Sequence, residues 1–274
     1  MSDIIEQLRD DANYYGKVGR QYISNSDIKV LLDDPSKFGV PTPDNPAFAK
    51  GRLFHQLILE PEKAAKVESI NTASRNSKMY KEACAERGVE FMLLTKEMQD
   101  IHGWAQKMLG NYDFYEAIRD DANKYEEPIV GTIMGRQFKA KADILCPDRI
   151  IDLKTTGNID DFKWSARKYG YDSQCYIYQS LFGVPLVFFA IDKKTGMMGM
   201  YEPSEDFVLR GRDKVERALE VHDKFFGANA THNIESFYKR FESRTTERNE
   251  LQNEGRYKEF DLLSKDRTPL VKAL

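Results

Sequence analysis

The chain has 274 residues, of which 41% are hydrophobic and 31% charged, and its formal net charge is −3. A chain of this length can bury a substantial core, and its composition excludes a disordered, collagen-like or disulfide-framework protein. The near-neutral charge also argues against a sequence-tolerant DNA-coating protein, although a local basic patch could still hold nucleic acid.

Two further observations define the expected cellular setting. No apolar run approaches the about 20 residues that span a bilayer, and the N-terminus lacks the apolar core of a signal peptide. Three widely spaced cysteines, Cys84, Cys146 and Cys175, match neither a disulfide framework nor a CxxC zinc site. We therefore expect a cytoplasmic protein with no membrane partner.

The first half of the chain is predicted to be mostly helical. Residues 1–20 are polar and contain tyrosine and glycine, which is typical of a loosely held arm. A Ser-Asn-Ser sequence at 24–26 can cap a short helix, and Pro61 ends a later one. We expect helices at 27–33, 50–60 and 96–109, with a proline-containing loop at 39–47.

The most informative stretch begins as a strand of alternating residues. Apolar residues at 138, 140, 142 and 144 fall on one side, and Lys139, Lys141 and Asp143 fall on the other. A Cys-Pro-Asp-Arg turn at 146–149 follows, and a second alternating run occupies 150–154. The pattern predicts a β-hairpin.

The parity of this hairpin brings two acids together. If the turn is centred between residues 147 and 148, a two- or four-residue loop places Asp143 opposite Asp152. Like charges so placed, about 5 Å apart at Cβ, are destabilising. A bound divalent cation would explain the arrangement, and carboxylate oxygens suit Mg²⁺ or Mn²⁺. Lys154 would add a positive charge on the same face as Asp152. On these residues alone, a solvent-exposed strand face is the commoner explanation of an Asp-x-Lys triplet.

Further strands and helices surround the hairpin. The residues from Glu126 to Val130 are expected to open the first strand of the sheet. After the hairpin we expect a helix at 159–182, interrupted near Gly170, then strands at 186–192 and 197–201 and an amphipathic helix at 205–222. Residues 229–274 mix charges of both signs, as in a solvated helix and tail.

Asp143, followed nine residues later by the Asp-Leu-Lys sequence at 152–154, resembles the PD-(D/E)xK nuclease signature. The strings GRLFHQLILEPE, IIDLKTT and KYGYDSQCYIY are similar to the exonuclease VIII (RecE) branch of that superfamily and to RecB-type nuclease domains. The resemblance runs from about Tyr22 to about Gly196. Asp152 stands where Glu is commoner, although exonuclease VIII-like members accept Asp.

The resemblance implies roles for residues near the hairpin. His55, Asp143 and Asp152 would be the metal ligands, with Lys154 as a catalytic residue that positions the nucleophile or offsets developing charge. Glu126 resembles the acid that leads the family's sheet and lies near the metal or its water. An exposed charge at a strand start is an equally open alternative for Glu126.

The resemblance also implies DNA-binding residues on the helix behind the hairpin. Gln174 and Tyr178 match the family's Gln-x-x-x-Tyr element, which lies beside the metal and touches DNA. Tyr171 and Lys168 resemble adjoining residues that could stack on a base or hold phosphate. Aromatic residues at helical spacing more often pack in a core, which remains the alternative for the tyrosines.

The expected fold is therefore an α/β protein with a restriction-endonuclease-like core: a mixed central sheet flanked by helices, with extra helices at both ends. We expect three parts: an N-terminal arm at 1–20, a nuclease domain at 21–228 and a charged C-terminal helix and tail at 229–274.

The expected function is that of a Mg²⁺- or Mn²⁺-dependent DNA exonuclease of phage type that resects duplex ends 5′ to 3′ for recombination. A structure-specific or single-strand endonuclease and a catalytically silent DNA-binding protein are the alternatives. The resemblance further implies a homo-oligomer and a strand-annealing recombination protein as partner. Three cysteines cannot hold a four-cysteine iron–sulfur cluster, so we expect none. The sequence contains no Gly-x-x-x-x-Gly-Lys-Ser/Thr loop, so we expect no bound nucleotide.

Overall fold

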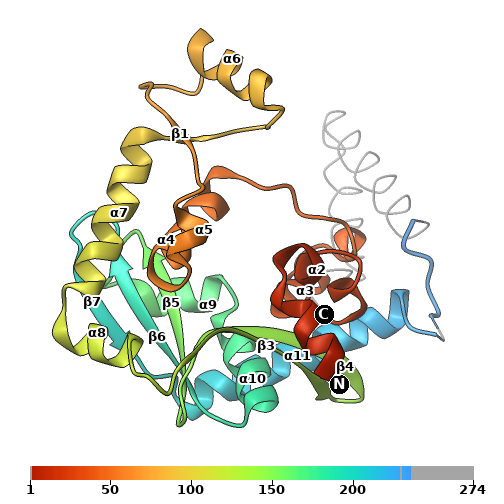
Figure 1. Ribbon diagram of the computed structural model, residues 1–274. Coiled ribbons are helices and arrows are strands. Elements are labelled where there is room, and N and C mark those ends of the chain that lie inside the picture. Colours follow the sequence, from red (N-terminus) through yellow and green to blue (C-terminus); the bar gives the residue numbers. More distant parts are fainter. Residues whose placement is uncertain (1, 229, 236–274) are drawn as a thin grey trace, which may run out of the picture.

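The computed structural model describes residues 2–228 and 230–235, so most of the predicted C-terminal helix and tail lies outside the described residues. The chain begins with helices and ends with a sheet and its covering helices (Figure 1). The first half contains α1 (Ser2–Arg9), α2 (Asp11–Tyr15), α3 (Asn25–Asp33), α4 (Pro46–Leu59), α5 (Pro61–Ala64), α6 (Lys78–Arg87), α7 (Thr95–Leu109) and α8 (Tyr112–Ile118), with short strands β1 (Ser69–Ile70) and β2 (Leu93–Leu94). The second half contains β3 (Lys124–Ile133), β4 (Arg136–Leu145), β5 (Ile150–Thr156), α9 (Phe162–Lys168), α10 (Tyr171–Phe182), β6 (Leu186–Asp192), β7 (Met198–Tyr201) and α11 (Glu205–Phe225).

A five-stranded mixed sheet in the order β3-β4-β5-β6-β7 forms the centre of the fold. The β5–β6 pair is parallel, and the other neighbouring pairs are antiparallel. The chain reaches the parallel strand β6 through α9 and α10, because two parallel strands need a crossover connection. The predicted α/β fold with a mixed sheet flanked by helices is confirmed.

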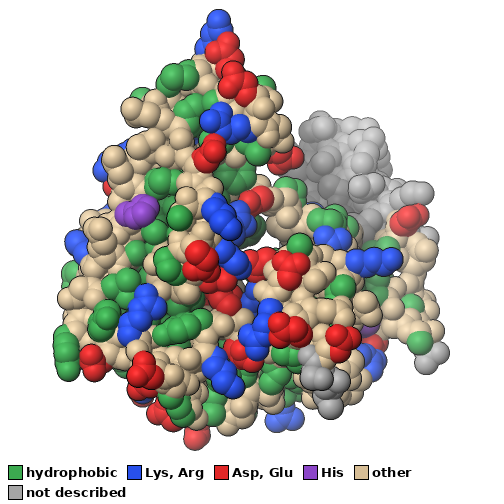
Figure 2. All heavy atoms as spheres, in the orientation of Figure 1, with side chains coloured by type: hydrophobic (Ala, Val, Ile, Leu, Met, Phe, Trp, Pro, Cys, Tyr) green, Lys and Arg blue, Asp and Glu red, His purple; other side chains and the backbone are tan. Residues whose placement is uncertain are grey.

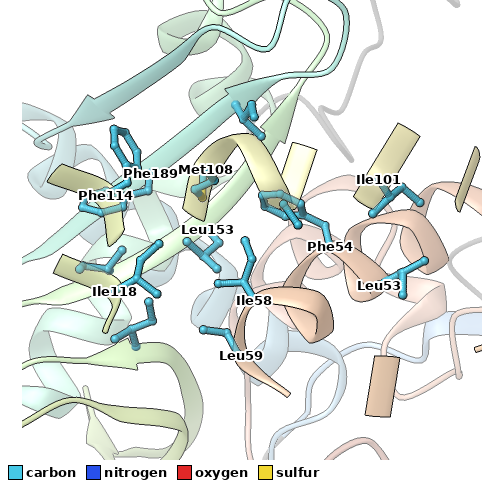
Figure 3. Packing of buried hydrophobic residues seen from close by; sticks show 14 of the residues in the cluster. Leu53, Phe54, Ile58, Leu59, Ile101, Met108, Phe114, Ile118, Leu153 and Phe189 are labelled. Atoms are coloured by element: carbon cyan, nitrogen blue, oxygen red, sulfur yellow. The ribbon is translucent and has the colours of Figure 1, made fainter. Parts of the chain in front are cut away.

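Helices cover both faces of this sheet. On one face, apolar residues of β5 and β6 pack against α4, α7 and α8, and Figure 3 shows Leu153 and Phe189 meeting side chains from these helices. On the other face, Cys175 of α10 and Phe162 of α9 pack against Phe188 and its neighbours. All seven residues of β6 are buried, as expected for a strand covered on both sides.

Local sequence signals account for most helix boundaries. Ser24 and Asp27 form a capping box at the start of α3, and Asn45 caps α4 with Pro46 in its first turn. Helix α4 therefore begins four residues before the predicted helix at 50–60. The predicted interruption near Gly170 is confirmed, because that glycine has a φ of +74° and separates α9 from α10.

The N-terminal residues differ from the loosely held arm expected of 1–20. They form α1 and α2, in which Leu8 and Tyr14 are buried. Arg9 makes two hydrogen bonds to the carboxylate of Glu127 on β3, at 2.8 and 3.0 Å. The first 20 residues are mostly polar and their helices are short. Their sequence therefore did not predict that Leu8 and Tyr14 would be buried against the rest of the protein.

Helix α6 stands apart from the rest of the molecule (Figure 1). It is reached through the segments that pair as the parallel strands β1 and β2. A small apolar cluster centred on Tyr80, Cys84 and Met92 holds it there. No helix among residues 2–228 and 230–235 is both long and apolar enough to cross a membrane.

Candidate metal centre

The site forms where two strands of the sheet separate. The ladder between β4 and β5 contains the pairs Ile144↔Ile151 and Leu145↔Ile150. This is the predicted register, with a four-residue loop at 146–149. Beyond these pairs the strands diverge, which leaves the backbone N–H and C=O groups of Leu153 without backbone partners on β4.

Two candidate site residues satisfy those backbone groups. The N–H of Leu153 donates to Oδ2 of Asp143 at 2.8 Å, and its carbonyl accepts from Nε2 of His55 at 2.8 Å. Buried backbone groups require such partners, so the separation of the strands itself fixes both side chains. Asp143 is the residue of β4 next to the last ladder pair, Ile144↔Ile151, and its side chain takes over the contact with the β5 backbone.

By register, three acids fall in one transverse row of the sheet, although β4 and β5 have already separated at this row. The β3–β4 ladder pairs Tyr125 with Ile144 and Glu127 with Ala142, so Glu126 falls opposite Asp143. Continuing the β4–β5 register places Asp143 opposite Asp152. The row predicted for two carboxylates therefore extends to a third, on β3.

Glu126 has an unusual backbone conformation for this position. Its φ is +48°, in the left-handed region, inside a strand and without a glycine's freedom. A carboxylate oxygen of Glu126, a nitrogen of His55 and a carboxylate oxygen of Asp143 lie within 4.8 Å of one another. The distorted backbone accompanies a side chain that joins this group, which is the pattern of strain at a functional site.

His55 comes from α4 and points its two ring nitrogens at different partners. Because Nε2 donates to a carbonyl, Nδ1 is the nitrogen that faces Asp143, 3.4 Å from Oδ2. Burial acts to lower the pKa of His55, but the carboxylate of Asp143 outweighs it and raises the pKa to about 9. A proton and a metal ion would compete for Nδ1.

Asp152 lies deepest in the site and is bound by a lysine and an amide. Its side chain is 3% exposed, compared with 26% for His55. Nζ of Lys154 lies 2.6 Å from Oδ2, and Nε2 of Gln174 donates to Oδ1 at 2.5 Å. The geometry of the lysine contact is that of an ion pair without an aligned hydrogen bond, and among the described residues Oδ2 has no hydrogen-bond donor.

The acids of the row differ in their affinity for protons. Burial raises the pKa of Asp152 despite the ion pair with Lys154. Burial acts in the same direction on Asp143, but His55 outweighs it and lowers the pKa of that carboxyl. Burial and the neighbouring Asp143 raise the pKa of Glu126 to about 7. Such divergent pKa values within one cluster are common at functional sites.

The residues present fit a divalent cation. Ligands of an octahedral Mg²⁺ at about 2.1 Å lie at most about 4.2 Å apart, close to the 4.8 Å limit within which the donor atoms of His55, Glu126 and Asp143 lie. The Nε2–H bond of His55 to a carbonyl is the outer contact that orients a metal-binding imidazole. Among the described residues this group contains the predicted ligands His55 and Asp143 and, in place of Asp152, Glu126. Oδ2 of Asp152 lies 2.6 Å from Nζ of Lys154 instead.

Two of the predicted DNA-binding residues face inward. Gln174 is buried and holds Asp152, while the hydroxyl of Tyr178 donates to the carbonyl of Lys141 at 3.0 Å. Tyr171 is half-buried, with Nζ of Lys154 4.8 Å from its ring centroid. Lys168 is exposed at the end of α9. Helix α10 thus brings the Gln174 and Tyr178 side chains to the strands that carry the acids.

Lys139 and Lys141, which share the strand face of Asp143, are buried beneath the N-terminal helices. Lys139 donates to the carbonyl of Tyr14, and Nζ of Lys141 lies 2.6 Å from Oδ1 of Asp11 and 3.7 Å from Oε2 of Glu126. An alternating pattern distinguishes the two faces of a strand, but it does not reveal that another segment covers the polar face.

Two residues at the mouth of the site were not predicted from the sequence. Arg52 precedes His55 by three residues on α4, a spacing that places both on one side of a helix, and its guanidinium pairs with the exposed Asp44. Tyr15 is 67% exposed, with its ring 6.0 Å from Nζ of Lys141. No sequence signal predicts a role for Tyr15. Figure 2 shows acidic and basic side chains around a hollow in the middle of the face that it draws.

The fold and the site together define a PDDEXK-like protein. Residues 36–229 match the family described as "PDDEXK-like domain of unknown function (DUF3799)", which is well over half of the chain. The chain belongs to this family. No curated protein matches it.

Solved structures support the fold assignment. The crystal structure of a protein from Eubacterium rectale, described as a putative exonuclease, is similar with a TM-score of 0.58 and 19% sequence identity, over 78% of this chain and 86% of that chain. At this identity the likeness shows a common fold. The structure of SSO0001 is similar at a TM-score of 0.28 and 17% identity, over 62% of this chain and 86% of that chain, which is too weak to support any conclusion.

Proposed function

We propose that this protein is a Mg²⁺- or Mn²⁺-dependent DNA exonuclease that resects duplex ends 5′ to 3′ for recombination. The observation that supports it most directly is the convergence of His55, Glu126 and Asp143, whose donor atoms lie within 4.8 Å of one another, beside the Asp152–Lys154 pair. Two comparisons agree with this proposal. The chain belongs to a PDDEXK-like family, and it shares its fold with a protein described as a putative exonuclease.

The proposed roles follow from the position of each side chain. Nδ1 of His55 and oxygens of Glu126, Asp143 and Asp152 would hold the ion. The bound ion supplies a Lewis acid for the scissile phosphate and lowers the pKa of water. Lys154, held 2.6 Å from Asp152, places a fixed ammonium group where negative charge develops on the phosphoryl oxygens. Gln174 keeps Asp152 in place.

Metal binding can be measured without any substrate. Adding Mn²⁺ should raise the thermal unfolding midpoint of the wild-type protein, because a ligand that binds the folded state stabilises it. An Asp143→Asn variant should lose most of this shift, whereas Asp148→Asn, an exposed substitution in the β4–β5 turn, should retain it. An equal Mn²⁺ shift in wild type and Asp143→Asn would refute the proposed metal ligands.

Activity assays separate the exonuclease from its alternatives. The purified protein should degrade linear duplex DNA with Mg²⁺ or Mn²⁺ and leave closed circular duplex intact, and 5′-labelled ends should be released first. Lys154→Ala should reduce the rate by about 10²–10³-fold. Cutting of closed circles would instead indicate an endonuclease, and inertness on both substrates a catalytically silent DNA-binding protein.

The proposal extends to assembly. A closed homo-oligomer around DNA and a strand-annealing recombination partner would suit an enzyme that must stay on one end. Sedimentation of the full chain at micromolar concentration should give a mass several times 31.7 kDa. A monomeric mass would remove the ring from the proposal without changing the chemistry.

A further inference from the structure

Helix α9 exposes aromatic and basic side chains together, outside the metal centre. Trp164 is 57% exposed and Tyr169, directly after the helix, is 52% exposed. Exposed rings also occur on α8, where Tyr112 is 74% exposed, so exposure alone does not set α9 apart. The helix is held to the protein by its opposite side, through the buried Phe162 and Ala166.

Cations surround these exposed rings. Nζ of Lys163 and Cζ of Arg167 lie 5.3 and 5.2 Å from the ring of Trp164. Nζ of Lys168 lies 5.6 Å from the ring of Tyr169. Residues 162–171, FKWSARKYGY, contain three cations and no acid, although Asp160 and Asp161 precede the helix. The side chains of Lys163, Arg167 and Lys168 make no ion pair with an acid among the described residues.

A shallow groove extends this positive surface. It has a volume of about 220 Å³ and lies between α9, β7 and the start of α11. Lys163, Arg167 and Arg210 contribute its cations and Glu202 its acid. The stacked rings of Phe162 and Tyr201, 4.3 Å apart, form its apolar part.

A continuous series of contacts connects this surface to the metal centre. The rings of Tyr169 and Tyr171 lie 6.2 Å apart, and Nζ of Lys154 lies 4.8 Å from the Tyr171 ring. Lys154 in turn forms the ion pair with Asp152. The connection is also covalent and short, since α9 begins six residues after β5 ends. The exposed surface of α9 is thus linked to the metal centre through Tyr169, Tyr171 and Lys154.

We propose that α9 binds single-stranded DNA, with an unpaired base stacked on Trp164 and phosphates held by Lys163, Arg167 and Lys168. Exposed aromatic rings beside cations are the elements that bind single strands without sequence preference, because every base has a face that can stack. The proposal rests on the proposed nuclease function for its biological meaning. It adds to that function the part of the substrate that α9 would bind, a single DNA strand leading to or from the metal centre.

Binding can be tested in EDTA, where metal-dependent cleavage is suppressed. Anisotropy of a fluorescein-labelled 20-mer of thymidine should show that Trp164→Ala weakens affinity by about tenfold. Trp164→Phe, which keeps an aromatic face, should stay within about threefold of wild type. Tyr112→Ala, which removes a 74% exposed ring from α8, is the matched control and should not alter affinity.

Two further measurements identify the mode of binding. The Trp104→Phe variant leaves Trp164 as the single tryptophan of the chain, and its fluorescence should be quenched when the oligonucleotide is added. A Lys163→Ala, Arg167→Ala double variant should lower the slope of log affinity against log salt by about 1.4, because each lost phosphate contact to a single strand is worth about 0.7.

The outcomes distinguish this inference from the proposed function. Unchanged oligonucleotide affinity in Trp164→Ala would overturn the single-strand surface even if the enzyme degrades DNA normally, and would favour α9 as a protein-docking surface. If Trp164→Ala binds the 20-mer tenfold more weakly than wild type while the wild-type protein shows no nuclease activity, the single-strand surface is supported and the nuclease proposal is refuted. Equal losses on closed circular duplex and on the 20-mer would also overturn it, since stacking requires an unpaired base.

Discussion

At the scale of single residues, Glu126 combines an energetically unfavourable backbone with an unfavourable charge. A left-handed conformation costs a non-glycine residue about 1–2 kcal/mol. Burial and the facing Asp143 add a further penalty by raising the pKa of Glu126 to about 7. A residue kept under both penalties, with its oxygen in the His55–Asp143 group, is expected to serve the site at the expense of stability.

The substitution Glu126→Gly separates these contributions. Glycine adopts a positive φ without strain, so in EDTA the variant should be at least as stable as wild type by calorimetry, while its Mn²⁺-induced rise in unfolding temperature should decrease. Met134→Gly is the matched control, because Met134 also has a φ of +48° but lies in the β3–β4 turn. It should gain stability and keep the full metal response. A marked loss of stability in Glu126→Gly would contradict the strain argument.

Gln174 acts through Asp152 and is a positioning residue. Replacing it with leucine removes the hydrogen bond to a carboxylate oxygen that is buried, and outer contacts of this kind typically contribute 10- to 100-fold in metal affinity or activity. We expect Gln174→Leu to weaken Mn²⁺ binding by about that factor in a titration. A Gln179→Leu change, five residues further along the same helix, should leave the affinity unaltered.

At the scale of elements, the hairpin register could be read from the sequence, but the separation of its strands could not. The alternation and the turn at 146–149 were sufficient to pair Ile144 with Ile151. Nothing in the pattern distinguishes a ladder that continues from one that opens after two pairs. The contacts of His55 and Asp143 with Leu153 depend on that opening, so they were accessible only from the structure, whereas His55 itself came from a family resemblance.

Asp192 gives the β6–β7 connection a predictable response to acid. Its carboxylate accepts hydrogen bonds from the backbone of Lys194, Thr195 and Ile159, and these bonds lower its pKa. A carboxyl with a lowered folded-state pKa stabilises the protein above its unfolded pKa of about 3.9 and loses that contribution as the pH falls through the folded-state pKa.

We therefore expect Asp192→Asn to be less stable than wild type in urea at pH 7 and to approach it at the acid end of the range, below about pH 4. Urea midpoints at several pH values would measure this. A stability difference that does not change with pH would show that the carboxylate charge is not what holds the turn.

At the scale of the whole molecule, the N-terminal helices are part of the scaffold of the site. Lys139 is buried beneath Tyr14, and burial lowers its pKa to about 8. Lys141 joins Asp11 of α2 to Glu126 of the acidic row. Composition alone suggested a free arm here, because the strand partners of these helices, Glu127, Lys139 and Lys141, are more than 100 residues away in the sequence and leave no local periodicity.

The buried side chain of Leu8 tests this arrangement. Leu8→Ala should reduce the free energy of unfolding by about 2–5 kcal/mol, as expected for a fully buried leucine, and should lower the guanidinium midpoint accordingly. Tyr112→Ala, at an exposed position, should change it by no more than about 0.5 kcal/mol. A Leu8→Ala variant as stable as wild type would show that residues 1–20 are a loosely held arm that does not contribute to the stability of the fold.

The contact between Lys141 and Asp11 determines how far the N-terminus of the protein can be truncated. The family match begins at residue 36, so a minimal fragment cut at that boundary would lack the Asp11 carboxylate that pairs with Lys141 and the Tyr14 ring that lies against Lys139 and Lys141. Such a fragment would expose two lysines that are buried in the whole chain, so purification tags are better added before Ser2 than used to replace the segment that follows it.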